Sequence, residues 1–185
     1  MPDPDSTRLA RIQRVSGRIA TACAVLMVVL PVFLLTAALA WPEFLAMQNA
    51  ARQIGIEADE ISGLARLASF AAMVIGSAPL LWGLWVLRRL FQSYAAGDVF
   101  TPAAAQHLKY AAYALLALIV TRPIGGALFG LALSIDTVKQ GGQGHLMIAF
   151  GSTEVWLGLA GAIVLVIAWI MGEAAAMAEE NKAFV

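Results

Sequence analysis

Long stretches without a charged side chain alternate along this chain with short segments that carry several charges. Three such stretches contain 24, 21 and 18 residues, and a fourth of 26 residues is interrupted only by Arg122. Because an α-helix rises about 1.5 Å per residue and the hydrocarbon core of a bilayer is about 30 Å thick, each stretch is long enough to cross it as a helix. The pattern predicts four spans, near residues 19–41, 67–87, 110–133 and 155–172.

The composition agrees with this pattern. Of the 185 residues, 61% are apolar and 13% are charged, and the mean hydropathy is +0.79. These values exclude three classes of protein: intrinsically disordered chains, proteins that coat nucleic acid, and small secreted domains held together by disulfide bonds. We expect an all-α integral membrane four-helix bundle, with a basic tail at residues 1–18 and a single domain at residues 19–185. The apolar stretch 19–40 is longer than a signal-peptide core, so we expect it to be retained as a span.

The basic residues are divided unequally between the two predicted sides of the membrane. Eight of them lie in the N-terminal tail, the 88–109 connection and the C-terminal tail, against three in the other two connections. By the positive-inside rule both termini are cytoplasmic, and the 42–66 and 134–154 connections are external. The positions of the tryptophans agree, because each lies near a predicted boundary: Trp41, Trp82, Trp85, Trp156 and Trp169.

The connection between spans two and three has the signals of a tight helical hairpin. Gly97 is placed to close the first helix in the left-handed conformation, Thr101 to cap the second, and Pro102 to begin it. One interpretation is simply a well-made turn. The other is a docking surface for a cytoplasmic partner, which includes Asp98 and Phe100.

The two external connections have different patterns. In the first, apolar residues recur at helical spacing, which predicts a helix on the outer membrane surface. In the second, apolar residues flank Gly141–Gly144, which is typical of a short β-hairpin.

Arg122 is the one charge predicted to lie within a span. Counted from Tyr110 it is about 18 Å along the helix, near the middle of the bilayer, where a charge costs about 2.5–3.5 kcal/mol. Pro123 removes a backbone donor and leaves a carbonyl free, and Glu154 and Asp136 are the candidate counter-ions. We favour a structural ion pair that stabilises a kink; the alternative is an anion-binding or proton-conducting site at Arg122.

Residues that carry chemistry are otherwise scarce. The two histidines, His107 and His145, lie on opposite predicted sides of the membrane, and Cys23 is the only cysteine. We therefore expect no metal, no cofactor, no catalytic site and no direct binding of nucleic acid. Small residues recur in Gly126-x-x-x-Gly130 and Gly158-x-x-x-Ala162, which predicts close helix packing at these positions; the sequence does not determine the oligomeric state.

Two segments resemble a known family. FQSYAAGDVFTPAAAQHL and the ending GEAAAMAEENKAFV, with Glu179, Glu180 and Asn181, are similar to the bacterial four-helix membrane protein family catalogued as domain of unknown function 2975. The chain departs from the family in having alanines at 103–105 where a Glu-Asn pair is usual. The resemblance implies a bacterial inner-membrane protein, in a family often encoded beside a small helix-turn-helix regulator.

Three functions remain open at this point. The first is a non-enzymatic membrane protein that engages a cytoplasmic regulator through residues 97–102, His107 and residues 179–181. The second is an immunity or stress-protection protein that meets a peptide or toxin at its external connections. The third is a small transporter-like bundle that binds a ligand at Arg122.

Overall fold

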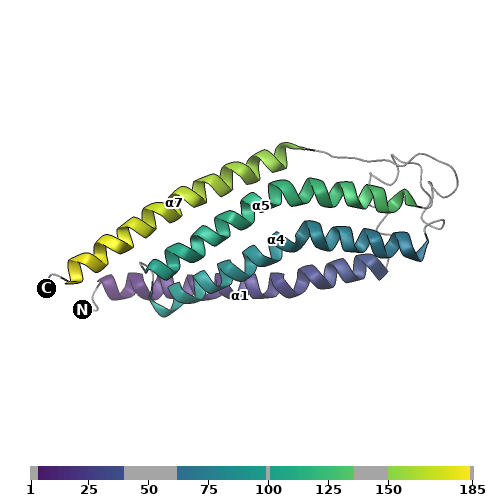
Figure 1. Cartoon of the computed structure of the whole chain (residues 1–185). Helices are drawn as coiled ribbons and strands as arrows, with labels where there is room; N and C mark the ends of the chain where they lie inside the picture. Colours follow the sequence, from purple (N-terminus) through teal and green to yellow (C-terminus); the bar gives the residue numbers. More distant parts are fainter. Residues whose placement is uncertain (1–3, 40–61, 99–100, 136–149, 184–185) are drawn as a thin grey trace.

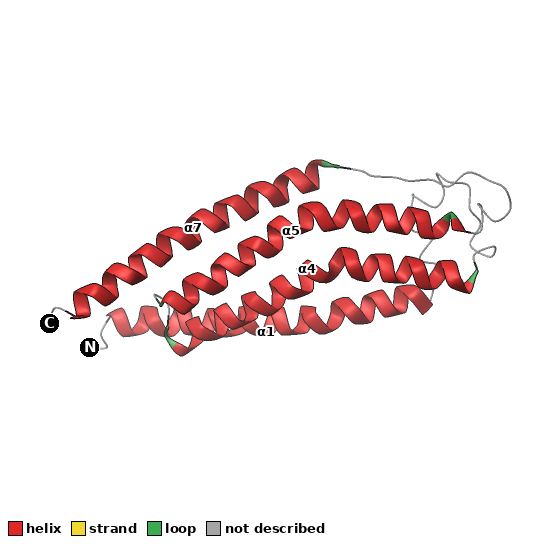
Figure 2. Cartoon of the chain, viewed as in Figure 1, coloured by secondary structure: helices red, strands yellow, loops and turns green. Residues whose placement is uncertain are grey.

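A computed structural model describes residues 4–39, 62–98, 101–135 and 150–183. These residues form four helices: α1 (Pro4–Leu39), α4 (Gly63–Ala96), α5 (Pro102–Leu133) and α7 (Ser152–Ala183). All four are long and apolar enough to cross a membrane, and the described part of the chain contains no strand (Figure 2). The predicted all-α fold is therefore confirmed for the described residues, and its four helices are candidate membrane spans.

The two predicted features of the external connections lie largely beyond the described residues. The β-hairpin at Gly141–Gly144 is not described. Most of the surface helix predicted within residues 42–66 is not described either, and the end of that segment belongs to α4, which begins at Gly63. Ser62 caps this helix by accepting a hydrogen bond from the Ala65 amide at 3.3 Å, so α4 begins four residues before the predicted span.

The helices pack in the order α1, α4, α5, α7 (Figure 1). The α4–α5 pair is central, and α1 and α7 each pack mainly on one of its two members. α5 is the most buried helix. The core consists chiefly of small side chains, as is usual where helices associate in lipid and backbones approach closely: Ala65, Ala72, Ala104, Ala111, Ala112 and Ala114.

Each helix is longer than the apolar stretch that it contains. At 32 to 36 residues the helices span about 48–54 Å, whereas the hydrocarbon core needs about 30 Å. Most of the excess lies at one end, where both termini and the α4–α5 turn are found (Figure 1). We call the residues 4–18, 88–98, 101–109 and 173–183 the juxtamembrane end. The segment predicted as a basic tail at its start is helical from Pro4 and continuous with the first span.

α7 is displaced along the molecule relative to α5. Its third residue, Glu154, lies beside Arg122, Gly161 packs against Leu116, and Gly172 lies near Ala105. α7 therefore begins about two-thirds of the way along α5 and extends past the start of α5 at the juxtamembrane end (Figure 1). The end of α5 beyond about Gly125 has no partner from the described part of α7.

Candidate functional site

The predicted intramembrane charge is paired with one of its two candidate counter-ions. The Nε of Arg122 lies 4.0 Å from Oε1 of Glu154, and the two side chains are 48% and 11% exposed. Asp136, the other candidate, lies outside the described residues. Pro123 is buried within α5, which continues through it as one helix to Leu133.

The position of Glu154 in the chain explains its orientation. It is the third residue of α7, from which a glutamate can reach back to the backbone at the helix start. The amide of Gly151 donates a hydrogen bond to Oε2 of Glu154 at 2.8 Å. One carboxylate oxygen thus caps the N-terminus of α7, while the other faces the guanidinium of Arg122.

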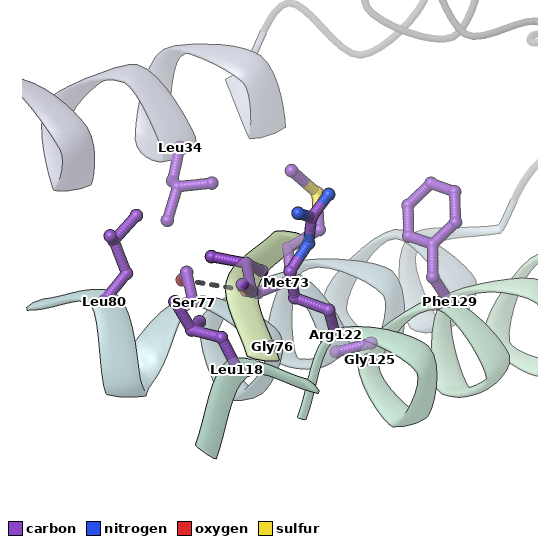
Figure 3. A pocket seen from close by; sticks show the side chains of 12 residues that line it. Leu34, Met73, Gly76, Ser77, Leu80, Leu118, Arg122, Gly125 and Phe129 are labelled. Carbon is purple, nitrogen blue, oxygen red and sulfur yellow. Dashed lines mark hydrogen bonds between the residues drawn. The ribbon is translucent and has the colours of Figure 1, made fainter. Parts of the chain in front are cut away.

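Arg122 also lines a cavity of about 570 Å³. The walls come from all four helices, and Arg122 is the one charged residue among the described residues that form them. Figure 3 shows the Arg122 side chain projecting from α5 beside Met73 of α4, with Leu34 of α1 across the space. The hydroxyl of Ser77, the other polar group in the wall, already donates to the carbonyl of Met73 at 2.9 Å.

α4 and α5 cross very closely at the wall of this cavity. A Cβ added at Gly125 would lie 2.9 Å from the Cα of Gly76 and 3.3 Å from the carbonyl oxygen of Ala72. Such a crossing requires glycine, because the atoms it meets belong to the backbone. The prediction of close packing at Gly126 is wrong: a Cβ there would meet nothing within 4 Å, and the glycine that packs is its neighbour.

In α7, too, the residue that packs closely is one position away from a residue that the sequence pattern singled out. Gly161 is buried, and a Cβ there would lie 2.9 Å from Leu116 Cδ2. Ala162, which the sequence pattern singled out, is exposed, although Gly158 does face Ile119 of α5. The spacing of small residues was thus informative about which helices pack closely, but it did not identify the contacting face.

The α4–α5 turn has the predicted capping chemistry. Gly97 has a φ of +99°, and its amide donates to the Tyr94 carbonyl while the Asp98 amide donates to Ser93. Thr101 accepts a hydrogen bond from the Ala104 amide at 3.2 Å, and Pro102 begins α5. These predictions are confirmed, and Phe100 lies outside the described residues.

The turn has a neighbour that the sequence did not indicate. Gln13 of α1 lies against it, since a Cβ on Gly97 would come within 3.3 Å of Gln13 Nε2. The other part of the predicted cytoplasmic surface, residues 179–181, forms the last turns of α7, where the side chain of Glu180 is exposed. α7 passes Ala105 at Gly172, so residues 179–181 lie about two turns beyond Ala105 and between one and two turns beyond Pro102, the start of α5.

The described residues that could bind a metal or take part in redox chemistry do not form a site. No cluster of three or more His, Cys, Asp or Glu residues able to hold a metal is found within the described ranges. Cys23 is a buried free thiol on α1. The Nδ1 of His107 is buried without a hydrogen-bond partner, so this ring is not a freely exposed group of the juxtamembrane end.

Comparison with known protein families gives a match over most of the chain. The model of a family described as "protein of unknown function (DUF2975)" matches residues 35–185. No curated protein and no solved structure matches the chain. The resemblance inferred from the sequence motifs is confirmed, and it covers most of the chain.

Proposed function

Since the chain belongs to the DUF2975 family of proteins of unknown function, its role must be inferred from its own residues, and we propose that it is a non-enzymatic, multi-pass protein of the bacterial inner membrane that engages a cytoplasmic partner. This proposal rests on the length of the helices at the juxtamembrane end. All four helices continue there beyond their apolar stretches, and they do so at the end richest in lysine and arginine. A protein that needed only to cross the bilayer would not require these extensions.

The surface of the juxtamembrane end supports a docking role. Ile12 and Val15 on α1 and Met177 on α7 are exposed, although they lie beyond the predicted hydrocarbon core. Lipid chains do not cover side chains at that level, and exposed apolar side chains rimmed by polar ones are typical of protein interaction sites. Exposed Arg11 and Arg14 flank the apolar pair on α1. The proposed partner is a small helix-turn-helix regulator, the class that the family resemblance implies.

The orientation with both termini in the cytoplasm is testable by cysteine labelling. In a Cys23→Ala background, single cysteines are placed at Ala96 and Gly63, which are exposed at the two opposite ends of α4. We expect a membrane-impermeant maleimide to label position 63 in spheroplasts and position 96 only after lysis, because basic segments stay in the cytoplasm. Labelling of position 96 before lysis, with position 63 protected, would reverse the topology.

If the partner docks at the juxtamembrane end, an introduced aspartate should weaken binding of the partner there but not at the opposite end of the molecule. Met177→Asp is expected to reduce retention of the proposed helix-turn-helix regulator on the detergent-purified protein by at least tenfold, because it places a charge in the apolar contact. Leu64→Asp is the matched control, since Leu64 is also an exposed apolar residue beyond the predicted hydrocarbon core but lies at the opposite end, at the start of α4. Equal retention by Met177→Asp, Leu64→Asp and wild type would refute docking at this surface.

The immunity alternative concerns the external connections. Their residues 40–61 and 136–149 lie outside the described residues, so no observation favours that function over docking at the juxtamembrane end.

A further inference from the structure

A second cavity continues from the one at Arg122. It has a volume of about 170 Å³, lies between α4, α5 and α7, and shares Leu80 and Leu118 with the larger cavity. Every described residue that lines it is apolar, and the wall reaches Leu108 of α5. Leu108 is fourteen residues from Arg122, about 21 Å along the helix. The two cavities therefore form one apolar groove that has a guanidinium near its outer end.

The guanidinium has unused binding capacity. Arginine carries five N–H donors in a fixed planar fork, and within the described structure Arg122 makes a single ion pair, at 4.0 Å through Nε. The side chain is 48% exposed, and it lines a space that is otherwise almost wholly apolar. In a membrane that space contains little water, so an arginine with unfilled donors is costly unless another anion completes its coordination.

We propose that this groove binds a single-chain anionic amphiphile of the fatty-acid class. The carboxylate is held by Arg122, and the acyl chain lies along α5 through the shared residues Leu80 and Leu118 toward Leu108. Arginine suits a carboxylate because the two groups form parallel, charge-assisted hydrogen bonds. The combined groove falls in the size range of sites for one small molecule, and its narrow inner part is suited to one chain.

Glu154 determines how much negative charge the ligand can carry. Its Oε1 already faces Arg122, so the site holds one positive and one negative charge before a ligand arrives. A monocarboxylate adds a single charge on the far side of the guanidinium. A doubly charged phosphate monoester would be repelled more strongly by Glu154, which disfavours it.

The packing order of the helices gives the ligand a route from the bilayer. α1 and α7 both border the cavity, through Leu34 and Leu157, yet each packs mainly on the central pair rather than on the other. The groove thus opens sideways between them. An amphiphile dissolved in the membrane reaches it without crossing water.

The test uses the full-length protein in nanodiscs of zwitterionic lipid, with radiolabelled palmitate as the probe. Saturable binding is expected, with an affinity at least tenfold weaker in Arg122→Gln and largely restored in Arg122→Lys, because lysine keeps the charge. Gly126→Leu is expected to weaken binding by a similar factor, because Gly126 lines the cavity and its Cβ would enter open space without a clash. Gly17→Leu is the matched control: it also meets open space but lies on α1 outside both cavities.

Competition identifies the occupant. Unlabelled palmitate should displace the probe, whereas hexadecanol, which has the same chain and no charge, should compete at least tenfold less well. Displacement by phosphatidylglycerol at equal concentration would assign the groove to bulk anionic lipid and overturn the proposal. Equal binding by wild type, Arg122→Gln and Gly126→Leu would also overturn it, and neither result would affect docking at the juxtamembrane end.

Discussion

Gly125→Leu is expected to abolish the folded protein. A side chain at this position meets backbone atoms of α4, the nearest being the Cα of Gly76 at 2.9 Å from the added Cβ, and backbone cannot rotate away. α4 and α5 would have to separate, and their contact is the central one of the fold. Even Gly125→Ala should lower the free energy of unfolding by about 1–3 kcal/mol. Size-exclusion profiles and thermal unfolding in detergent measure both effects.

The adjacent glycine supplies the control. Gly126→Ala places the same methyl group one residue later, where nothing lies within 4 Å. Its melting temperature should equal that of wild type or exceed it slightly, because alanine favours a helix over glycine by about 1 kcal/mol. If Gly125→Leu were as monodisperse and as stable as Gly126→Ala, the close crossing of α4 and α5 would be incorrect.

Glu154→Gln is expected to lower the free energy of unfolding by about 1–3 kcal/mol, because it leaves Arg122 without its counter-ion at membrane depth. The loss should be smaller than for a fully buried pair, since Arg122 is 48% exposed. Glutamine keeps an oxygen that can accept the Gly151 amide, so the substitution removes the charge and retains the cap.

A double-mutant cycle distinguishes a pair from two independent residues. Arg122→Gln alone should also destabilise, and Arg122→Gln with Glu154→Gln should recover most of the loss because neither charge is then unpaired. Glu180→Gln, which alters an exposed glutamate on the same helix, should leave thermal unfolding unchanged. Additive losses in the double variant would show that the 4.0 Å pair contributes no coupling.

The features that could be predicted from the sequence are those that depend on residues close together in the chain. The four spans follow from the spacing of charges, and the turn at Gly97 and Thr101 follows from local capping chemistry that operates within one helical turn. Arg122 stood out because a charge within an apolar stretch is costly wherever the helix packs. Glu154 and Asp136 were both candidates, and only the displacement of α7 along α5 places Glu154 beside Arg122.

The packing faces were not predictable from the sequence, and the reason is physical. In a soluble helix the buried face is apolar and the exposed face polar, so periodicity reveals orientation. In a membrane both faces are apolar, and exposed Ile124 and Val120 read the same as buried Leu118. The choice between Gly125 and Gly126, the order of the helices and the groove beside Arg122 all depend on that missing signal.

The short turn between α4 and α5 has a consequence for biosynthesis. α4 and α5 are joined by the short turn Gly97–Thr101, a connection suited to insertion as one antiparallel hairpin whose second arm carries Arg122. Glu154 follows 32 residues later and belongs to a separate helix, α7. Because the ion pair forms only when α7 packs against α5, we expect the apolar residues of the hairpin to supply the free energy that inserts Arg122.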